Sequence, residues 1–116
     1  MIKGIGLDIV EINRIEAVSK RQNKLPFRVL TEAEREIYFA LGEIRKVEFL
    51  AGRFAAKEAY AKARGTGIGS QLSFLDIEIL PDTLGKPQIR KPLFGKAHLS
   101  ITHTEQYAAA QVIIED

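Results

Sequence analysis

The sequence predicts an α+β fold in which an antiparallel sheet packs with one long and two shorter helices. Between residues 12 and 64, apolar side chains recur at helical spacing, whereas after residue 70 they alternate as they do in strands. The chain has 116 residues, of which 46% are hydrophobic and 28% charged, which suits one hydrophobic core. No repeat or linker divides it, so we expect residues 1–116 to form a single domain.

The first two predicted elements are a strand and a short helix. GIGLDIV near the N-terminus is apolar and β-branched, which favours a strand over residues 2–10. Ile12, Ile15 and Val18 then recur at helical spacing. This helix must stop before Pro26, because proline does not continue a helix.

A second short helix and a long helix follow. TEAE is a capping box, with Thr31 as the N-cap and Glu34 reaching back to it. We expect Gly42 to end this helix. The long helix covers residues 44–63, and the glycine-rich GTGIG at 65–69 closes it.

The remainder of the chain predicts four more strands, most of them antiparallel neighbours. PDTLGKP is turn chemistry, and it separates the first two of these strands. The four strands are LDIEIL at 75–80, QIR at 88–90, HLSIT at 98–102 and YAAAQVII at 107–114. The last one is rich in alanine and β-branched residues, which suits close packing against another subunit and favours a homo-oligomer.

Composition excludes several classes of protein. The chain has no cysteine, which excludes disulfides and thiolate chemistry. No apolar run approaches the roughly 20 residues of a membrane span, and MIKGIGLDIV lacks the layout of a signal peptide. We therefore expect a cytoplasmic protein with no membrane contact.

The net charge of +2 is unevenly distributed. Between residues 12 and 30 a single acid, Glu16, stands against a cluster of cations. That cluster includes Arg14, Arg21, Lys24 and Arg28. Two interpretations are open: a solvated helix face, or a docking surface for an acidic partner.

A carboxylate lies on the apolar side of the long helix. Successive side chains turn by about 100° around a helix axis, so the residues that point in nearly the same direction as Val47 form one apolar stripe. It contains Leu50, Ala51, Phe54 and Ala61. Glu58 lies about 20° from the same direction. An unpaired buried carboxylate costs several kcal/mol, so Glu58 needs a partner, and both Lys57 and Lys62 flank it.

A second acid lies on the first strand. Gly4, Gly6 and Asp8 share one face of this strand, because side chains alternate. The opposite face carries Ile5, Leu7 and Ile9. Glycine inside a strand marks a place where another group approaches closely, so we expect a hollow beside Asp8.

Asp8 and Glu58 together fit a hard divalent cation. Magnesium takes one or two carboxylates and completes its shell with waters and substrate phosphates. In the alternative interpretation, Asp8 caps a turn and Glu58 pairs with a lysine or arginine. GIGLDI lacks the third glycine of a dinucleotide fingerprint, and no nucleophile, base and orienting group form a set for acyl-enzyme chemistry.

The motifs that hold these residues resemble a known family. GIGLDIVEINRI, FLAGRFAAKEAYAKA, GTGIG and SITHT occur in the order and spacing of the holo-acyl-carrier-protein synthases, the small 4'-phosphopantetheinyl transferases. The resemblance implies transfer of phosphopantetheine from coenzyme A to a serine of apo-acyl carrier protein, in fatty acid biosynthesis. It implies magnesium on Asp8 and Glu58, with Lys62 at the pyrophosphate as a third catalytic residue.

The resemblance also implies binding sites and an assembly. Coenzyme A is expected at Arg53, Lys62, Gly65 and His103. The acidic carrier protein is expected on Arg14, Arg21, Lys24 and Arg28. The family's trimers imply a homotrimer with active sites at subunit boundaries. Asp8 or a metal-bound water is expected to take the proton of the serine.

Two other functions compete with this one. The first is a different magnesium-dependent phosphoryl or nucleotidyl transferase that uses the same two acids. The second is a basic, non-enzymatic binding module. RNA is not expected as its partner, because the basic cluster lacks interleaved aromatic residues.

Overall fold

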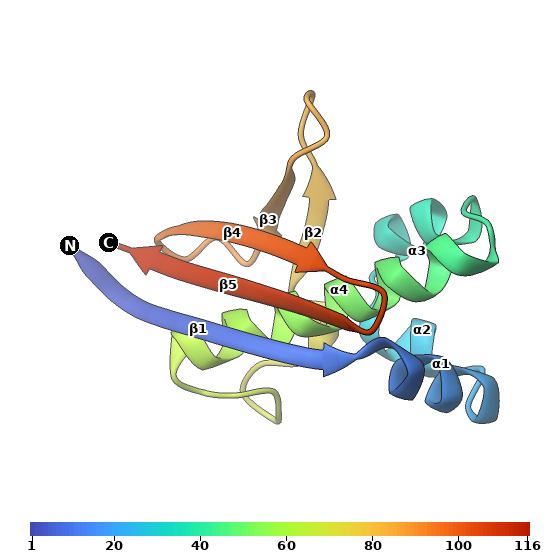
Figure 1. The fold of residues 1–116 in the computed structure, drawn as a ribbon. Coiled ribbons are helices and arrows are strands. Elements are labelled where there is room, and N and C mark those ends of the chain that lie inside the picture. Colours follow the sequence, from blue (N-terminus) through green and yellow to red (C-terminus); the bar gives the residue numbers. More distant parts are fainter.

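Four helices, a short 3-10 helix and five strands make up the structure (Figure 1). It is a computed structural model that describes all of residues 1–116. The first half contains β1 (Ile2–Glu11), α1 (Ile12–Arg21), α2 (Leu25–Val29), α3 (Glu32–Phe39) and α4 (Glu43–Arg64). The second half contains η1 (Phe74–Asp76), β2 (Glu78–Pro81), β3 (Pro87–Lys91), β4 (Lys96–His103) and β5 (Tyr107–Glu115).

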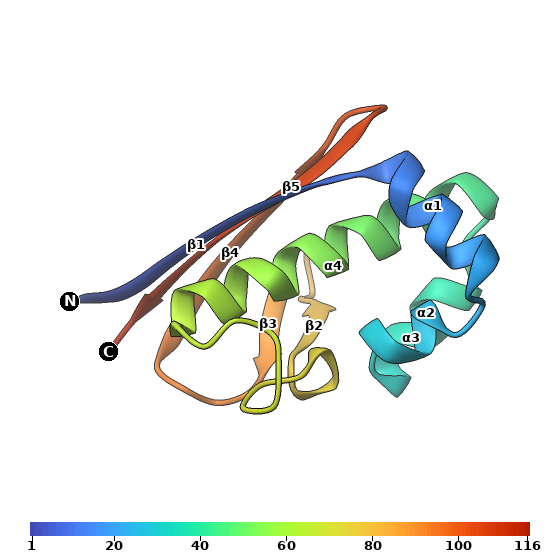
Figure 2. The same ribbon diagram turned by 90° about the horizontal axis from the view of Figure 1, so that it is seen from below.

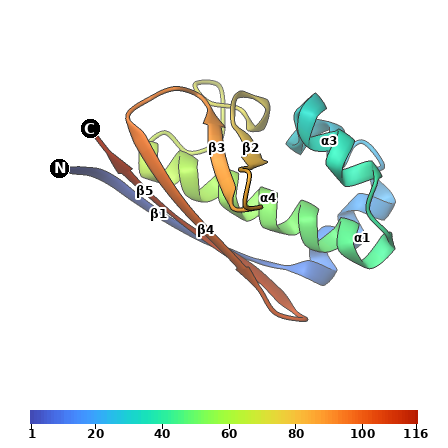
Figure 3. The same ribbon diagram turned by 90° about the horizontal axis from the view of Figure 1, so that it is seen from above.

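The long helix α4 lies between two antiparallel sheets. One sheet has three strands in the order β1-β5-β4, and the other is the β2–β3 hairpin. Figures 2 and 3 show α4 running between them, with the three shorter helices gathered around its N-terminal end. The predicted α+β fold is confirmed, but the strands form two sheets instead of one. None of the helices has the length and apolar character that a bilayer span requires.

Because of this layering, the middle of α4 is buried on most of its circumference. One apolar cluster joins Tyr60 of α4 to Ile79 of β2 and Val112 of β5. A second cluster, at the helical end, joins Leu50 to Ile12 and Leu30. The single apolar stripe predicted for α4 is therefore too narrow, since side chains outside it are buried as well.

The glycines of β1 allow that strand to lie directly against the backbone of α4. A Cβ added at Gly6 would lie 2.7 Å from the carbonyl carbon of Ala59 and closer still to its oxygen. A Cβ at Gly4 would meet the carbonyl of Ala63 in the same way. The prediction of close approach is correct, but the expected hollow is wrong, because the α4 backbone fills that space.

The helix ends agree with the sequence, with one exception. Thr31 and Glu34 form the predicted capping box, with Glu34 N donating to Thr31 Oγ1 at 3.3 Å and Thr31 N to Glu34 Oε1 at 2.7 Å. Gly65 ends α4 with φ +83°, a left-handed conformation that glycine adopts easily. Gly42 does not end α3, which stops at Phe39; it is the N-cap of α4.

On the outward face of the three-stranded sheet, β1 presents an exposed apolar row. Ile5, Leu7 and Ile9 on β1 are 59%, 63% and 63% exposed. On β5, by contrast, Ala110 and Val112 are buried against α4 within the same chain. Packing of the last strand on another subunit stays a prediction, because its other face, which includes Ile113 opposite Ile5, points to the same side of the sheet as the β1 row.

Candidate active site

Asp8, Glu58 and Lys62 come together where β1 crosses α4. The glycine contacts hold the strand against the helix, so Asp8, two residues beyond Gly6, faces the side of α4 that carries Glu58 and Lys62. Lys62 Nζ donates to Asp8 Oδ1 at 3.0 Å and to the carbonyl oxygen of Leu7 at 3.0 Å. The Asp8 side chain is only 14% exposed, so its charge is largely removed from water.

Glu58 is half-buried, and its pKa responds to burial and to the two charged neighbours Asp8 and Lys62. Burial raises the pKa of Glu58 above its ordinary value, and the negative charge of Asp8 raises it further. The ammonium of Lys62 opposes both effects. Two carboxylates therefore repel each other beside a single lysine, which is an arrangement that an added cation stabilises.

The two carboxylates fit a hard divalent cation such as magnesium. No group of three or more acidic or histidine side chains converges anywhere in the structure. Asp8 and Glu58 supply two oxygen ligands, the number of carboxylates that protein magnesium sites commonly use. Waters and phosphate oxygens are suited to supply the other ligands of such an ion.

Arg53 and His103 line a different hollow of about 340 Å³ on the other side of α4. His103 Nδ1 lies 3.9 Å from Glu48 Oε2, and Arg45 Nε lies 3.9 Å from Glu48 Oε1. Phe49, Gly85 of the hairpin turn and Ile101 also line this hollow. Sequence reasoning missed Arg45, Glu48 and Phe49, although their spacing from Arg53 places them on one side of the helix.

The Arg53 guanidinium is held in place but not fully paired. Its carbon lies 4.3 Å from the centre of the Phe49 ring. Its Nε is buried and has no hydrogen-bond partner. Burial lowers the pKa of Arg53, and the charge of Glu34 opposes that shift. A buried, unsatisfied donor in a hollow that also contains Arg45 suits a phosphate oxygen.

Gly65 lies at the C-terminal end of α4, three residues after Lys62. Its amide donates to the carbonyl of Lys62 at 3.0 Å, which closes the last turn. It does not line the hollow that holds Arg53 and His103. The residues expected at coenzyme A therefore divide between the C-terminal end of α4 and the hollow that Arg53, in the middle of α4, shares with His103 of β4.

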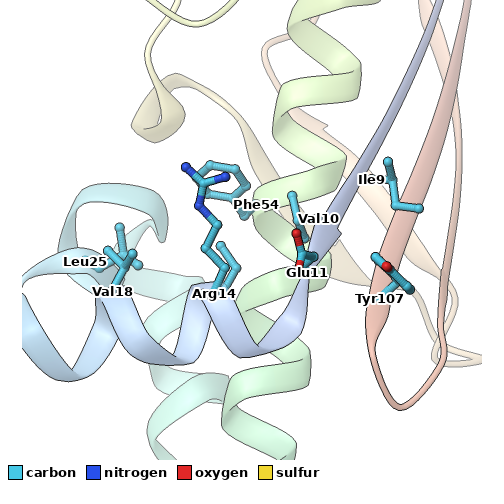
Figure 4. Close-up of a pocket in the computed structure, with 9 residues that line it drawn as sticks. Ile9, Val10, Glu11, Arg14, Val18, Leu25, Phe54 and Tyr107 are labelled. Carbon is cyan, nitrogen blue, oxygen red and sulfur yellow. The ribbon is translucent and has the colours of Figure 1, made fainter.

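The expected partner-binding residues lie on α1, on α2 and, for Lys24, at the N-cap of α2. Of the four, Arg14 lines an apolar hollow of about 440 Å³. Figure 4 shows Arg14 extending from α1 in the direction of Phe54 of α4, with Val18 and Leu25 also lining the hollow. Arg14, Arg21, Lys24 and Arg28 are all exposed, and none of them forms an ion pair.

Lys57 does not flank the site as predicted. It is fully buried and pairs with Glu34 on the opposite side of α4, so only Lys62 accompanies Glu58. The sequence pattern does not reveal this pair, because the capping box already accounts for Glu34. A lysine within an otherwise apolar helix interior was the available signal.

Comparison with known proteins agrees with these features. Residues 4–112 match the model of the 4'-phosphopantetheinyl transferase superfamily. The chain is 64% identical to a holo-[acyl-carrier-protein] synthase of Bacillus pumilus, over 99% of this chain and 97% of that protein. A crystal structure of a Bacillus anthracis holo-(acyl-carrier-protein) synthase in complex with CoA (3',5'-ADP) is similar, with a TM-score of 0.92 and 53% identity over 99% and 97% of the two chains. A Helicobacter pylori holo-[acyl-carrier-protein] synthase in complex with coenzyme A is also similar, with a TM-score of 0.85 and 36% identity over 96% and 99%.

Proposed function

Because this chain belongs to the 4'-phosphopantetheinyl transferase superfamily, we propose that residues 1–116 form a single transferase domain that modifies apo-acyl carrier protein. It transfers the 4'-phosphopantetheine group of coenzyme A to a serine of the carrier and releases adenosine 3',5'-bisphosphate. This reaction supplies holo-acyl carrier protein for fatty acid biosynthesis. The observation that carries the proposal is the group of Asp8, Glu58 and Lys62, in a chain 64% identical to a holo-[acyl-carrier-protein] synthase.

The chemistry follows from the charges of this group. Asp8 and Glu58 would hold a magnesium ion, which would supply positive charge to neutralise the charge that develops on the pyrophosphate. Lys62 is half-exposed beside them, so its ammonium can leave Asp8 and contact the same phosphate oxygens. Asp8, or a water molecule in the site, would take the proton of the attacking serine.

Coenzyme A would bind along α4. Lys62 and Gly65 lie at the end of the helix where the pyrophosphate reacts, and the hollow of Arg53 and His103 takes a further phosphate or the adenine. The unpaired Nε of Arg53 supports this placement, because a phosphate oxygen would satisfy it.

The carrier protein would dock on α1 and α2. Acyl carrier proteins are acidic, and the four unpaired cations there would attract and orient one. The apolar hollow beside Arg14 offers a site for an apolar side chain of the same partner.

We also propose that the protein acts in the cytoplasm as a homotrimer with active sites at subunit boundaries. The support for assembly is the row of Ile5, Leu7 and Ile9, since an exposed apolar row of this kind marks an interaction surface. The row lies on the strand that carries Asp8, so a neighbouring subunit on this face would lie close to the site.

Mass spectrometry tests the function directly. Apo-acyl carrier protein incubated with the chain, coenzyme A and magnesium should gain the mass of one phosphopantetheinyl group. Folded Glu58→Gln should produce little adduct. A nucleotidyl adduct in place of phosphopantetheine would favour the other magnesium-dependent transferase, and no adduct from folded protein would refute the proposal.

A further inference from the structure

Lys57 is the residue before Glu58 in α4, yet it takes no part in the site. Both it and its partner Glu34 are completely buried. Lys57 Nζ donates to Glu34 Oε1 at 2.6 Å, to the carbonyl oxygen of Val29 at 2.6 Å and to that of Phe74 at 3.1 Å. All three of its donors are therefore used.

Glu34 is equally well paired. Besides Lys57, it accepts hydrogen bonds from the amides of Thr31 at 2.7 Å and Ile79 at 2.8 Å. The two side chains thus link α4 to the end of α2, the start of α3, η1 and β2, mostly by hydrogen bonds to backbone groups. Burial lowers the pKa of Lys57, and the charge and hydrogen bond of Glu34 oppose that shift.

The contact with Val29 connects the pair to the segment that would bind the carrier protein. Val29 is the last residue of α2 and directly follows Arg28, one of the cations assigned to the carrier protein. Lys57 is also the neighbour of Glu58 in the α4 backbone. A single buried side chain therefore connects the segment that would bind the carrier to the helix that would perform the transfer.

We propose that Lys57 and Glu34 are positioning residues, which fix the carrier-docking segment 24–29 relative to Glu58 and thereby place the carrier's serine at the site. This inference rests on the proposed function. Stability alone is a weak reason for such a pair, because a buried ion pair replaced by neutral groups of similar size is often no less stable. Coenzyme A contacts on α4 itself do not depend on where α2 lies.

The double variant Lys57→Met with Glu34→Gln tests the proposal. It removes both charges together, so neither is left buried and unpaired, and the glutamine side chain keeps an oxygen acceptor for a backbone amide. We expect kcat/KM for the carrier protein to fall at least about tenfold, while the calorimetric Kd for coenzyme A changes by no more than about twofold. Lys46→Met is the control on the same helix: the Lys46 ammonium lies 4.0 Å from the exposed Glu43 and over the rings of Tyr38 and Phe39, so this change should alter neither quantity.

Each other outcome contradicts the proposal. A folded double variant with wild-type kinetics would show that the pair is purely structural. Parallel loss of carrier turnover and coenzyme A binding would show general disruption of α4. A wild-type chain that modifies no carrier refutes the proposed function and this inference with it, whereas an active wild type matched by the double variant refutes the inference alone.

Hydrogen exchange on the unmodified protein keeps the test independent of the variant's folding. If the pair transmits docking, apo-carrier protein should slow amide exchange in residues 29–34 and 55–58 as well as in 14–28. Protection confined to residues 14–28 would overturn the proposal.

Discussion

Replacing Gly6 with alanine should separate β1 from α4 and disrupt the site without touching any charged residue. The new Cβ would lie 2.7 Å from the carbonyl carbon of Ala59 and 2.9 Å from the amide nitrogen of Ala63. Both obstacles are backbone atoms inside a helix, so no side chain can move aside. Ordinary contact begins at 3.4 Å, so the strand must retreat by at least about 0.7 Å to clear this carbon, and further to clear the oxygen.

The cost follows from that displacement. Overpacking typically costs about 1–3 kcal/mol, and an obstacle made only of helix backbone atoms places Gly6→Ala at or above the upper end. A loss of about 3 kcal/mol would lower the melting temperature by roughly 10–20 °C in a domain of this size. The 3.0 Å contacts from Lys62 Nζ to Leu7 O and Asp8 Oδ1 would stretch at the same time, so carrier modification should fall with stability.

Urea denaturation followed by circular dichroism measures the first effect, and mass spectrometry of the carrier measures the second. Gly69→Ala is the matched control, because a Cβ there meets nothing within 4 Å. If Gly6→Ala unfolds within about 0.5 kcal/mol of Gly69→Ala, the strand is not held against the helix as described.

Three further predictions follow from the charges and the exposed face. Glu58→Gln should be more stable than wild type at neutral pH, because burial and Asp8 raise the pKa of Glu58, so folding disfavours its ionised form. The difference in stability should vanish as the pH falls below 4.5, the ordinary pKa of a glutamate. A difference in melting temperature that stays constant across that range would argue against this reasoning. Arg14→Glu should raise KM for the carrier protein roughly three- to tenfold with coenzyme A affinity unchanged, and loss of coenzyme A binding instead would refute the docking assignment. Leu7→Glu should shift light scattering from a trimer to a monomer, since it places a charge in the exposed apolar row; an unchanged assembly would exclude that face as the interface.

Much of the fold follows from local signals in the sequence. The capping box at Thr31, the left-handed Gly65 and the alternation of β1 each depend on residues close together in the chain, and all three are confirmed. The pairing of β1 with β5 and the separation of the hairpin into its own sheet depend on contacts between distant segments. Such contacts leave no periodic pattern within either strand, so the two-sheet arrangement could not be predicted.

Local sequence patterns also reveal part of the site, but not all of it. Asp8 and Glu58 interrupt apolar patterns, so each could be found from its own element. The glycines indicated a close approach, but a sequence pattern cannot distinguish an empty hollow from the backbone of a packed helix. The sequence also could not show that Lys57 points away from the site, because its partner Glu34 lies 23 residues away and also belongs to the capping box.

Calorimetric titration of magnesium into the protein with coenzyme A present tests most directly whether the acid of β1 and the acid of α4 hold one ion between them. The wild type should bind a single ion per chain. Asp8→Asn and Glu58→Gln should each weaken that binding at least about tenfold, whereas Glu36→Gln, an exposed acid of α3, should leave it unchanged. Wild-type magnesium affinity in both site variants would contradict the account.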